Sequence, residues 1–266
     1  MLLNFLKRKH VRMADRVNFI INGKEVRAFE GEYLLDVARR LGIEIPSLCH
    51  FPGIEPYASC RLCIVKVKAG GRERIVTSCN YPVKNGIQVI TNDEKILKLR
   101  KMIVKLLLFL APDSQELVEI SKSLGIRKEE LNLENVREGG KCILCGLCVR
   151  VCSEVVGAHA ITFSKRGKER EISTPYNEMD VNACIGCGAC SFVCPTGCIE
   201  METLKLRELM LSSSKGGMPC RYSLMGLLPG AICDNNYDCP GCFVDRQMIE
   251  IAQGKHPAFL IREQNE

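Results

Sequence analysis

The chain has 266 residues and a formal charge of +6, with no tryptophan and only 6% aromatic residues. Sparse aromatic residues argue against stacking on nucleic-acid bases. The positive charge does not indicate a polyanion partner either. Cysteines count as neutral in this sum but become negative when they bind metal, so a chain with many metal-bound thiols would carry less positive charge than this.

Cysteine departs furthest from ordinary usage, with 17 in the chain. So many thiols must be explained by metal or disulfides before any apolar core is considered. Many lie in C-x2-C runs, and residues 1–13 show neither a secretory nor a twin-arginine signal. The sequence therefore predicts a cytoplasmic protein whose thiols ligate metal, with residues 1–14 as a loose tail.

The first folded region is predicted over residues 15–92. Residues 17–28 indicate two strands joined by an Asn22-Gly23 turn, and a helix is expected at 33–41. Further short strands are expected at 74–78 and 87–90. The order of hairpin, helix, irregular loop and further strands predicts a β-grasp fold. Its loop is too polar, and too rich in Pro and Gly, to be stable without a ligand.

Four cysteines of this region are the predicted ligands of a 2Fe–2S cluster: Cys49, Cys60, Cys63 and Cys79. Their spacing, C-x10-C-x2-C-x15-C, differs from the plant ferredoxin pattern only in its longer first gap. A zinc site is the alternative. His50 is expected to hydrogen-bond or pack beside the cluster, because a Rieske-type site needs two histidines and the next one downstream is His159.

A helical linker is expected over residues 93–138. Residues 93–110 indicate an amphipathic helix that is too short and too charged to cross a membrane. Its predicted apolar face contains Leu99, Met102, Ile103, Leu106 and Leu110. Further helices are expected at 114–124 and 128–133.

Residues 139–203 hold two near-copies of one run, CILCGLCVRVC at 142–152 and CIGCGACSFVCP at 184–195. The spacing C-x2-C-x2-C-x3-C is typical of bacterial ferredoxins with two 4Fe–4S clusters, in which the fourth cysteine of each run ligates the other cluster. Zinc ligands usually come as two separated pairs, so a zinc site is disfavoured. The predicted ligand sets are Cys142, Cys145, Cys148 and Cys194, and Cys184, Cys187, Cys190 and Cys152.

Two smaller features accompany these runs. A short β-hairpin is expected within residues 164–180, between the two runs. Cys198, just after the second run, is predicted to be a buried thiol that ligates nothing.

Residues 204–266 form a cysteine-rich C-terminal region. A helix at about 202–212 and an SSSKGG linker precede four cysteines spaced C-x12-C-x5-C-x2-C: Cys220, Cys233, Cys239 and Cys242. So small a region cannot bury enough apolar surface to be stable without a staple. We therefore predict a further metal site, either zinc or another iron–sulfur cluster. His256 is an alternative ligand.

Much of the chain resembles known iron–sulfur subunits. The matching segments are PSLCHFPGIEPYASCRLCIVKV, the downstream TSC, and the stretch from ITFSKRGKEREISTPYNEMDV through CIGCGACSFVCPTG. They are similar to the amino-terminal part of the large iron–sulfur subunit of respiratory complex I. They also resemble the small diaphorase subunit of NAD-linked hydrogenases and the front end of iron-only hydrogenases. The matched parts span roughly residues 17–202.

The resemblance also shows a difference. In that family the linker supplies one His and three Cys to another 4Fe–4S cluster. This chain has no cysteine between Cys79 and Cys142 and no histidine between His50 and His159, so that cluster is expected to be absent. The expected fold is α+β: a β-grasp 2Fe–2S domain, a helical linker, a two-cluster 4Fe–4S ferredoxin domain and a small cysteine-rich tail.

The resemblance implies an electron-transfer subunit of a multisubunit cytoplasmic oxidoreductase. Its partners would be an NAD(P)-linked flavoprotein subunit and a catalytic metal subunit of the hydrogenase, formate dehydrogenase or molybdenum/tungsten oxidoreductase type, with soluble ferredoxin as a further partner. No dinucleotide or phosphate-binding motif is present, so we expect no catalytic residue in this chain. The alternative is a free-standing ferredoxin-like carrier or a redox-sensing module. A catalytic iron-only hydrogenase is disfavoured, because 72 residues after Cys194 are too few for its active-site domain.

Overall fold

A computed structural model describes residues 15–127, 130, 140–174, 183–199 and 218–263. Its contacts divide the chain into two compact units. The first contains Met1–Leu48, Cys60–Leu106 and Ile120–Leu131, and the second contains Cys49–Ser59, Leu107–Glu119 and Asn132–Glu266. The loop Cys49–Ser59 therefore groups with the second unit, although it lies between two cysteines of the predicted 2Fe–2S motif.

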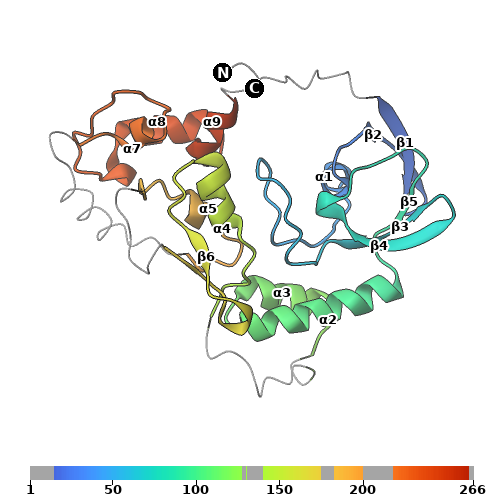
Figure 1. Cartoon of the computed structure of the whole chain (residues 1–266). Coiled ribbons are helices and arrows are strands. Elements are labelled where there is room, and N and C mark those ends of the chain that lie inside the picture. Colours follow the sequence, from blue (N-terminus) through green and yellow to red (C-terminus); the bar gives the residue numbers. More distant parts are fainter. Residues whose placement is uncertain (1–14, 128–129, 131–139, 175–182, 200–217, 264–266) are drawn as a thin grey trace, which may run out of the picture. The chain divides into compact units, whose positions relative to one another are not determined.

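The first unit is built on a five-stranded mixed sheet in the order β2-β1-β5-β3-β4 (Figure 1). Its strands are β1 (Arg16–Ile21), β2 (Lys24–Phe29), β3 (Ile64–Ala69), β4 (Arg72–Thr77) and β5 (Gln88–Ile90). β1 and β5 are parallel at the centre, and each outer pair is an antiparallel hairpin. Together with helix α1 (Leu34–Arg40), this topology confirms the predicted β-grasp fold.

The turn of the first hairpin follows from its residues. Asn22 and Gly23 have φ of 51° and 80°, which is the left-handed pair that a type I′ turn requires. The Asn22 side chain also binds Thr91, accepting from its N–H at 2.9 Å and donating to its hydroxyl at 2.8 Å. The turn therefore anchors the end of β5 as well as closing the first hairpin.

The core of this unit follows the alternation of β1, in which Val17, Phe19 and Ile21 are buried. They share the interior with Leu34, Leu35, Val37 and Ala38 of α1. A short 3-10 turn, η1 (Ser78–Asn80), follows β4 and packs against α1.

Helix α2 (Glu94–Leu110) has a different buried face from the one expected. The predicted face is wrong, because Met102, Leu106 and Leu110 are exposed. The buried positions are Ile96, Arg100, Val104, Leu107 and Leu108. The helix is rotated because Arg100 turns inward, where its guanidinium donates to the carbonyls of Leu62 (3.1 Å) and Ile64 (2.7 Å).

Helix α3 (Gln115–Ser123) confirms the helix expected at 114–124. Ser114 caps it, since its hydroxyl accepts from the N–H of Leu117 at 3.3 Å. Apart from residue 130, the helix expected at 128–133 lies outside the described residues, as does the one at 202–212. Within the described part of the chain, no helix is long and apolar enough to cross a membrane.

The second unit has short elements around its cysteine runs. Helix α4 (Leu147–Arg150) continues into a π-helical turn, η3 (Val151–Val155), and α5 (Ala189–Phe192) is its counterpart in the second run. A hairpin does lie between the runs, but it begins two residues before the predicted range: it consists of β6 (Thr162–Ser164) and β7 (Glu171–Ser173), with the 3-10 turn η4 (Gly167–Glu169) between them.

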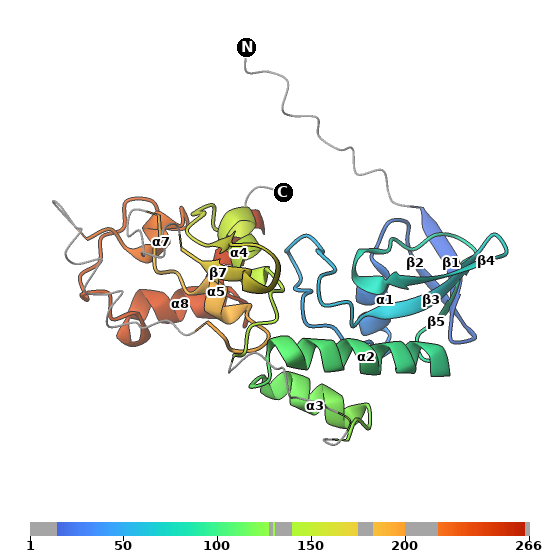
Figure 2. The same ribbon diagram turned by 60° about the horizontal axis from the view of Figure 1, so that its bottom comes forward.

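The C-terminal elements of this unit lie beside α4 and α5 in both views (Figures 1 and 2). They are α7 (Arg221–Leu224), η6 (Cys239–Gly241), α8 (Phe243–Ile251), η7 (Pro257–Phe259) and α9 (Leu260–Glu263). Aromatic contacts join them to other parts of the unit. Phe259 stacks on Phe51 at 5.3 Å between ring centroids, and His256 lies 5.6 Å from Phe192.

Candidate iron–sulfur sites

Three of the predicted 2Fe–2S ligands lie in the first unit. Cys60 and Cys63 precede β3, Cys79 lies in η1, and all three are at most 2% exposed. Ser78 donates both its N–H and its hydroxyl to the carbonyl of Cys63, each at 2.9 Å. These two bonds hold the turn that carries Cys79 against the loop that carries Cys63.

Arg100 is a part of this site that sequence reasoning missed. It is 3% exposed, and its two carbonyl acceptors, Leu62 and Ile64, flank Cys63 in the chain. Burial lowers the pKa of the guanidinium, and negative charge on Cys63 acts in the opposite direction. The signal in the sequence was a basic residue four positions from both Ile96 and Val104, in the middle of an apolar stripe.

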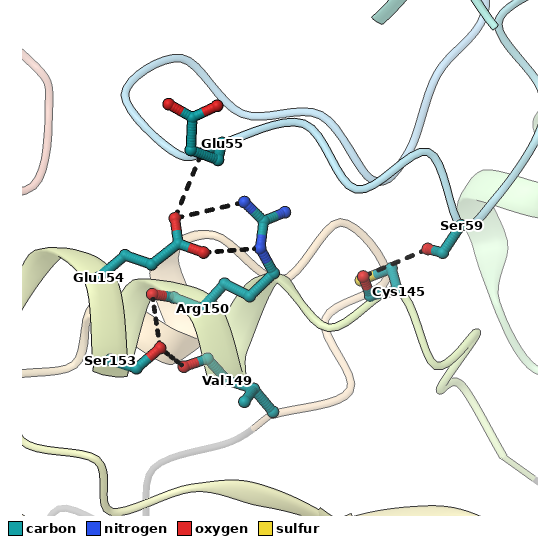
Figure 3. A network of polar contacts seen from close by, with 7 residues as sticks. All are labelled: Glu55, Ser59, Cys145, Val149, Arg150, Ser153 and Glu154. Carbon is teal, nitrogen blue, oxygen red and sulfur yellow. Dashed lines mark hydrogen bonds and ion pairs between the residues drawn. The ribbon is translucent and has the colours of Figure 1, made fainter. Parts of the chain in front are cut away.

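The fourth predicted ligand, Cys49, opens the loop Cys49–Ser59 of the second unit and is 1% exposed. Burial raises the pKa of the Cys145 thiol in the first ferredoxin run, and negative charge on Cys49 adds to that rise, so the two thiols lie near each other. The loop is bonded in two places, once to this run and once to the π-helical turn η3 at its end (Figure 3). The Ser59 hydroxyl donates to the carbonyl of Cys145 at 3.2 Å, and the N–H of Glu55 donates to the Glu154 carboxylate at 3.2 Å.

Glu154 is held in place for this second contact. Arg150, one helical turn earlier, donates to its carboxylate through Nε at 2.9 Å and Nη2 at 3.3 Å (Figure 3). The same guanidinium lies 5.7 Å from the ring centroid of Tyr57 in the loop. Arg150 and Glu154 thus form a polar anchor for the loop.

We expect Glu154→Ala to loosen the loop without unfolding the unit. One charge-assisted hydrogen bond is worth about 1–2 kcal/mol, so amide exchange at Glu55 should speed up by roughly five- to thirty-fold. Hydrogen exchange read by mass spectrometry over residues 49–59 would measure this. Glu169→Ala, which removes an exposed carboxylate from η4, is the control and should leave the loop unchanged. Equal exchange in both variants would contradict the anchor.

The two ferredoxin runs fold in the same way because their glycines recur. Gly146 and Gly188 each precede a helix with φ of 75° and 80°. Two residues earlier, Leu144 and Gly186 also have positive φ, 54° and 62°. The two left-handed residues flank the second cysteine of each run. The backbone therefore changes direction on both sides of that cysteine.

Gly146 has a second reason to be glycine. A Cβ placed there would lie 2.9 Å from the Phe163 ring. We expect Gly146→Ala to lower the free energy of unfolding by about 2–4 kcal/mol, from backbone strain and overpacking together. Gly157→Ala is the matched control, since Gly157 has the same φ of 75° with nothing within 4 Å, and should cost only about 1–2 kcal/mol. Chemical denaturation of both variants would measure the difference, and equal losses would exclude the contact with Phe163.

A cavity of about 410 Å³ opens beside the first run. Cys142, Cys145, Cys148 and Cys194 all line it, so the structure brings the last cysteine of the second run to the first three of the first run. Cys198 also lines it. Its N–H donates to the Cys194 sulfur at 3.3 Å, so Cys198 lies directly beside a predicted ligand.

The other predicted set is gathered in the same crossed manner. The thiols of Cys187 and Cys190 each interact electrostatically with those of Cys184 and Cys152. The N–H of Ala160 donates to the Cys152 sulfur at 3.3 Å, which fixes that side chain from its own run. Each set of four therefore contains one thiol from the opposite run.

The donor atoms fit iron–sulfur clusters. All 17 cysteines lie among the described residues, and none forms a disulfide. Burial raises the pKa of both Cys145 and Cys190 to about 12, so these thiols would stay protonated at neutral pH without a metal. In the described part of the chain, no three His, Cys, Asp or Glu side chains converge on a single-ion position. An iron–sulfur cluster does not need such a position, because each of its thiolates binds a different iron and the sulfurs need not converge on one point.

In the C-terminal region, the hydrogen bonds of His256 argue against its predicted role as an alternative metal ligand. The Nδ1 of His256 accepts from the N–H of Ala258 at 3.1 Å, so a neutral ring carries its proton on Nε2, which donates to the Cys187 carbonyl at 2.8 Å. Burial lowers the pKa of His256, which keeps the ring neutral. Both ring nitrogens are engaged, so the prediction that His256 could ligate a metal is wrong. Instead it joins the C-terminal region to the second ferredoxin run.

Comparison with known proteins identifies both halves of this arrangement. Residues 14–94 match a 2Fe-2S iron-sulfur cluster binding domain, and residues 141–203 match a 4Fe-4S dicluster domain. The chain is therefore an iron–sulfur protein that joins one domain of each kind.

Among its relatives is the NADPH-Fe(3+) oxidoreductase subunit alpha of Geobacter sulfurreducens, 34% identical over 214 residues, covering 72% of this chain and 25% of that protein. The NADP-reducing hydrogenase subunit HndD of Solidesulfovibrio fructosivorans is 31% identical over 208 residues, covering 67% and 35%. A solved NAD+-reducing NiFe hydrogenase matches with a TM-score of 0.51 and 26% identity, over 59% of this chain and 74% of that one.

Other relatives are subunits of NADH-quinone and NADH-ubiquinone oxidoreductases. The resemblance expected from the cysteine motifs is thus confirmed, and the chain is homologous to iron–sulfur subunits of NAD(P)-linked oxidoreductases. The match spans only a quarter to a third of the first curated relatives.

Proposed function

We propose that this protein is an electron-relay subunit of a multisubunit oxidoreductase. It connects an NAD(P)-linked flavoprotein subunit with a catalytic metal subunit of the hydrogenase, formate dehydrogenase or molybdenum/tungsten type. An iron–sulfur cluster, when bound, takes up and releases one electron at a time. The chain itself supplies thiolates, buries them from water and holds the loops that carry them.

The observation that carries this proposal is the attachment of the loop Cys49–Ser59 to the first ferredoxin run. Cys49 lies within electrostatic range of Cys145, and Ser59 is bonded to the Cys145 carbonyl. A ligand of the 2Fe–2S motif and a ligand of the dicluster motif are therefore neighbours within one compact unit. Such closeness supports electron exchange between the two kinds of site, even though the linker lacks the His and Cys residues of its relatives.

The ligand assignment is part of the proposal. Cys49, Cys60, Cys63 and Cys79 hold the 2Fe–2S cluster, and the two crossed sets hold the 4Fe–4S clusters. We further propose domain limits of 15–92, 93–138 and 139–203, followed by the C-terminal region at 204–266. The cytoplasmic location rests on the reduced thiols, which a secreted protein would tend to pair. The C-terminal cysteines are not needed for this relay.

Purification from the native source tests the assembly. A relay subunit should elute with flavoprotein and catalytic partners, whereas the alternative, a free-standing carrier or redox-sensing module, should elute alone near its mass of 29.7 kDa. Iron analysis tests the sites separately. The purified chain should contain at least about ten irons, two from the 2Fe–2S cluster and eight from the two 4Fe–4S clusters. Fewer irons would contradict the three-cluster assignment whatever the partners are.

A further inference from the structure

We propose that Cys220, Cys233, Cys239 and Cys242 form a fourth metal site, a tetrathiolate that binds an iron–sulfur cluster rather than a single zinc ion, because among the described residues no three such side chains converge on one ion position. These residues lie outside both matched domains, which end at residues 94 and 203. The inference does not depend on the proposed relay function, because a metal held here could stabilise the region with or without carrying electrons.

Backbone pairing gathers the first two cysteines. Pro219 and Ile232 form an antiparallel bridge. On either side of it, the N–H of Cys220 donates to the carbonyl of Ala231 at 2.9 Å, and the N–H of Cys233 donates to that of Met218 at 2.6 Å. Twelve intervening residues are thus folded back so that the two cysteines lie on adjacent strands.

The second pair is brought to the first through Tyr237. Its N–H donates to the Cys233 sulfur at 3.3 Å, and its hydroxyl donates to the carbonyl of Pro219 at 3.2 Å. Cys239 follows two residues later and interacts electrostatically with both Cys233 and Cys220. Cys239 begins the 3-10 turn η6, and Cys242 follows its last residue and donates its N–H to the Cys239 carbonyl at 3.0 Å. Amide-to-sulfur bonds of the kind made by Tyr237 stabilise metal-bound thiolates.

A partly buried positive charge accompanies these thiols. Arg221 follows Cys220 directly, pairs with Asp245 and donates to the Tyr222 hydroxyl at 3.0 Å. Its Nε is buried and finds no acceptor among the described residues. A tetrathiolate centre carries net negative charge, and the guanidinium next to Cys220 can offset part of it in addition to pairing with Asp245.

The region lacks the core that would otherwise hold it. From Met218 to Val244, the buried side chains are Tyr222, Met225 and Leu227, and most other positions are exposed or half-exposed. So little buried apolar surface does not offset the entropy of ordering nearly thirty residues, and a metal staple is the usual solution in small regions of this kind.

Metal analysis of the full chain tests the site. The double variant Cys239→Ser/Cys242→Ser should lose about two or about four irons per chain relative to the wild type, according to the type of cluster, and loss of a single zinc instead would overturn the assignment. The metal of the other three sites should remain. Glu250→Ala, which changes an exposed carboxylate on α8 of the same region, is the control and should lose none. Unchanged metal content in the double variant would overturn the proposal.

A second measurement needs no variant, so it decides the matter even if the double variant loses all its metal. The native wild-type protein is treated with iodoacetamide and the modified cysteines are identified by mass spectrometry. The four C-terminal cysteines should resist alkylation until acid destroys the cluster. Immediate alkylation of all four in the otherwise metal-loaded protein would show that they are unligated, and would overturn the site.

Discussion

Replacing Arg100 by Met is expected to lower the free energy of unfolding by about 2–4 kcal/mol, because it leaves buried acceptors without a donor. The guanidinium bonds the carbonyls of Leu62 and Ile64, and methionine fills similar space without donating to either. Urea denaturation of the full chain would measure the loss. The matched control is Lys98→Met, an exposed position on the same helix, which should change stability by less than about 0.5 kcal/mol.

Arg100→Met should also lower the reduction potential of the 2Fe–2S centre. Arg100 places positive charge near Cys63, and removing positive charge makes it harder to add an electron. A potentiometric titration followed by EPR would show the shift, and Arg100→Lys, which keeps the charge, should retain more of the wild-type potential than Arg100→Met. Equal potentials in the wild type and Arg100→Met would restrict Arg100 to a structural role.

Cys194→Ser is expected to remove one 4Fe–4S cluster, about four irons per chain, while the other cubane remains. The reason is the crossed arrangement: Cys194 belongs to the second run but lines the cavity of Cys142, Cys145 and Cys148 from the first. A serine hydroxyl is a harder and poorer ligand for iron in a cluster than a thiolate. Iron analysis and EPR of the reduced protein would count the remaining clusters.

Cys198→Ser is the control for this result, because Cys198 lines the same cavity and is predicted to ligate nothing. It should keep its full iron content. Equal iron loss in the two variants would mean that Cys198 takes part in the site. Loss of the cluster held by the second run in Cys194→Ser, with the first retained, would show that the runs are not crossed.

The sequence alone determined the class of protein, because cluster ligation leaves a local signature. Two C-x2-C-x2-C-x3-C runs and the loop with Cys60 and Cys63 predicted both kinds of iron–sulfur domain, and both domain matches confirm them. The order of elements in the β-grasp fold could also be predicted, since Asn22-Gly23 specifies a hairpin turn and buried and exposed residues alternate along the first strand.

The tertiary structure decided which residues surround the thiols. Hydrophobic periodicity placed Met102 and Leu106 in the core, but a buried guanidinium that binds two carbonyls turned α2 so that both are exposed. The sequence allowed His256 as an alternative ligand, but in the structure both of its ring nitrogens are in hydrogen bonds. The contact of the loop Cys49–Ser59 with the first run was equally invisible. Spacing records which thiols share a loop, whereas buried charges and hydrogen bonds between distant segments depend on packing that the local sequence does not encode.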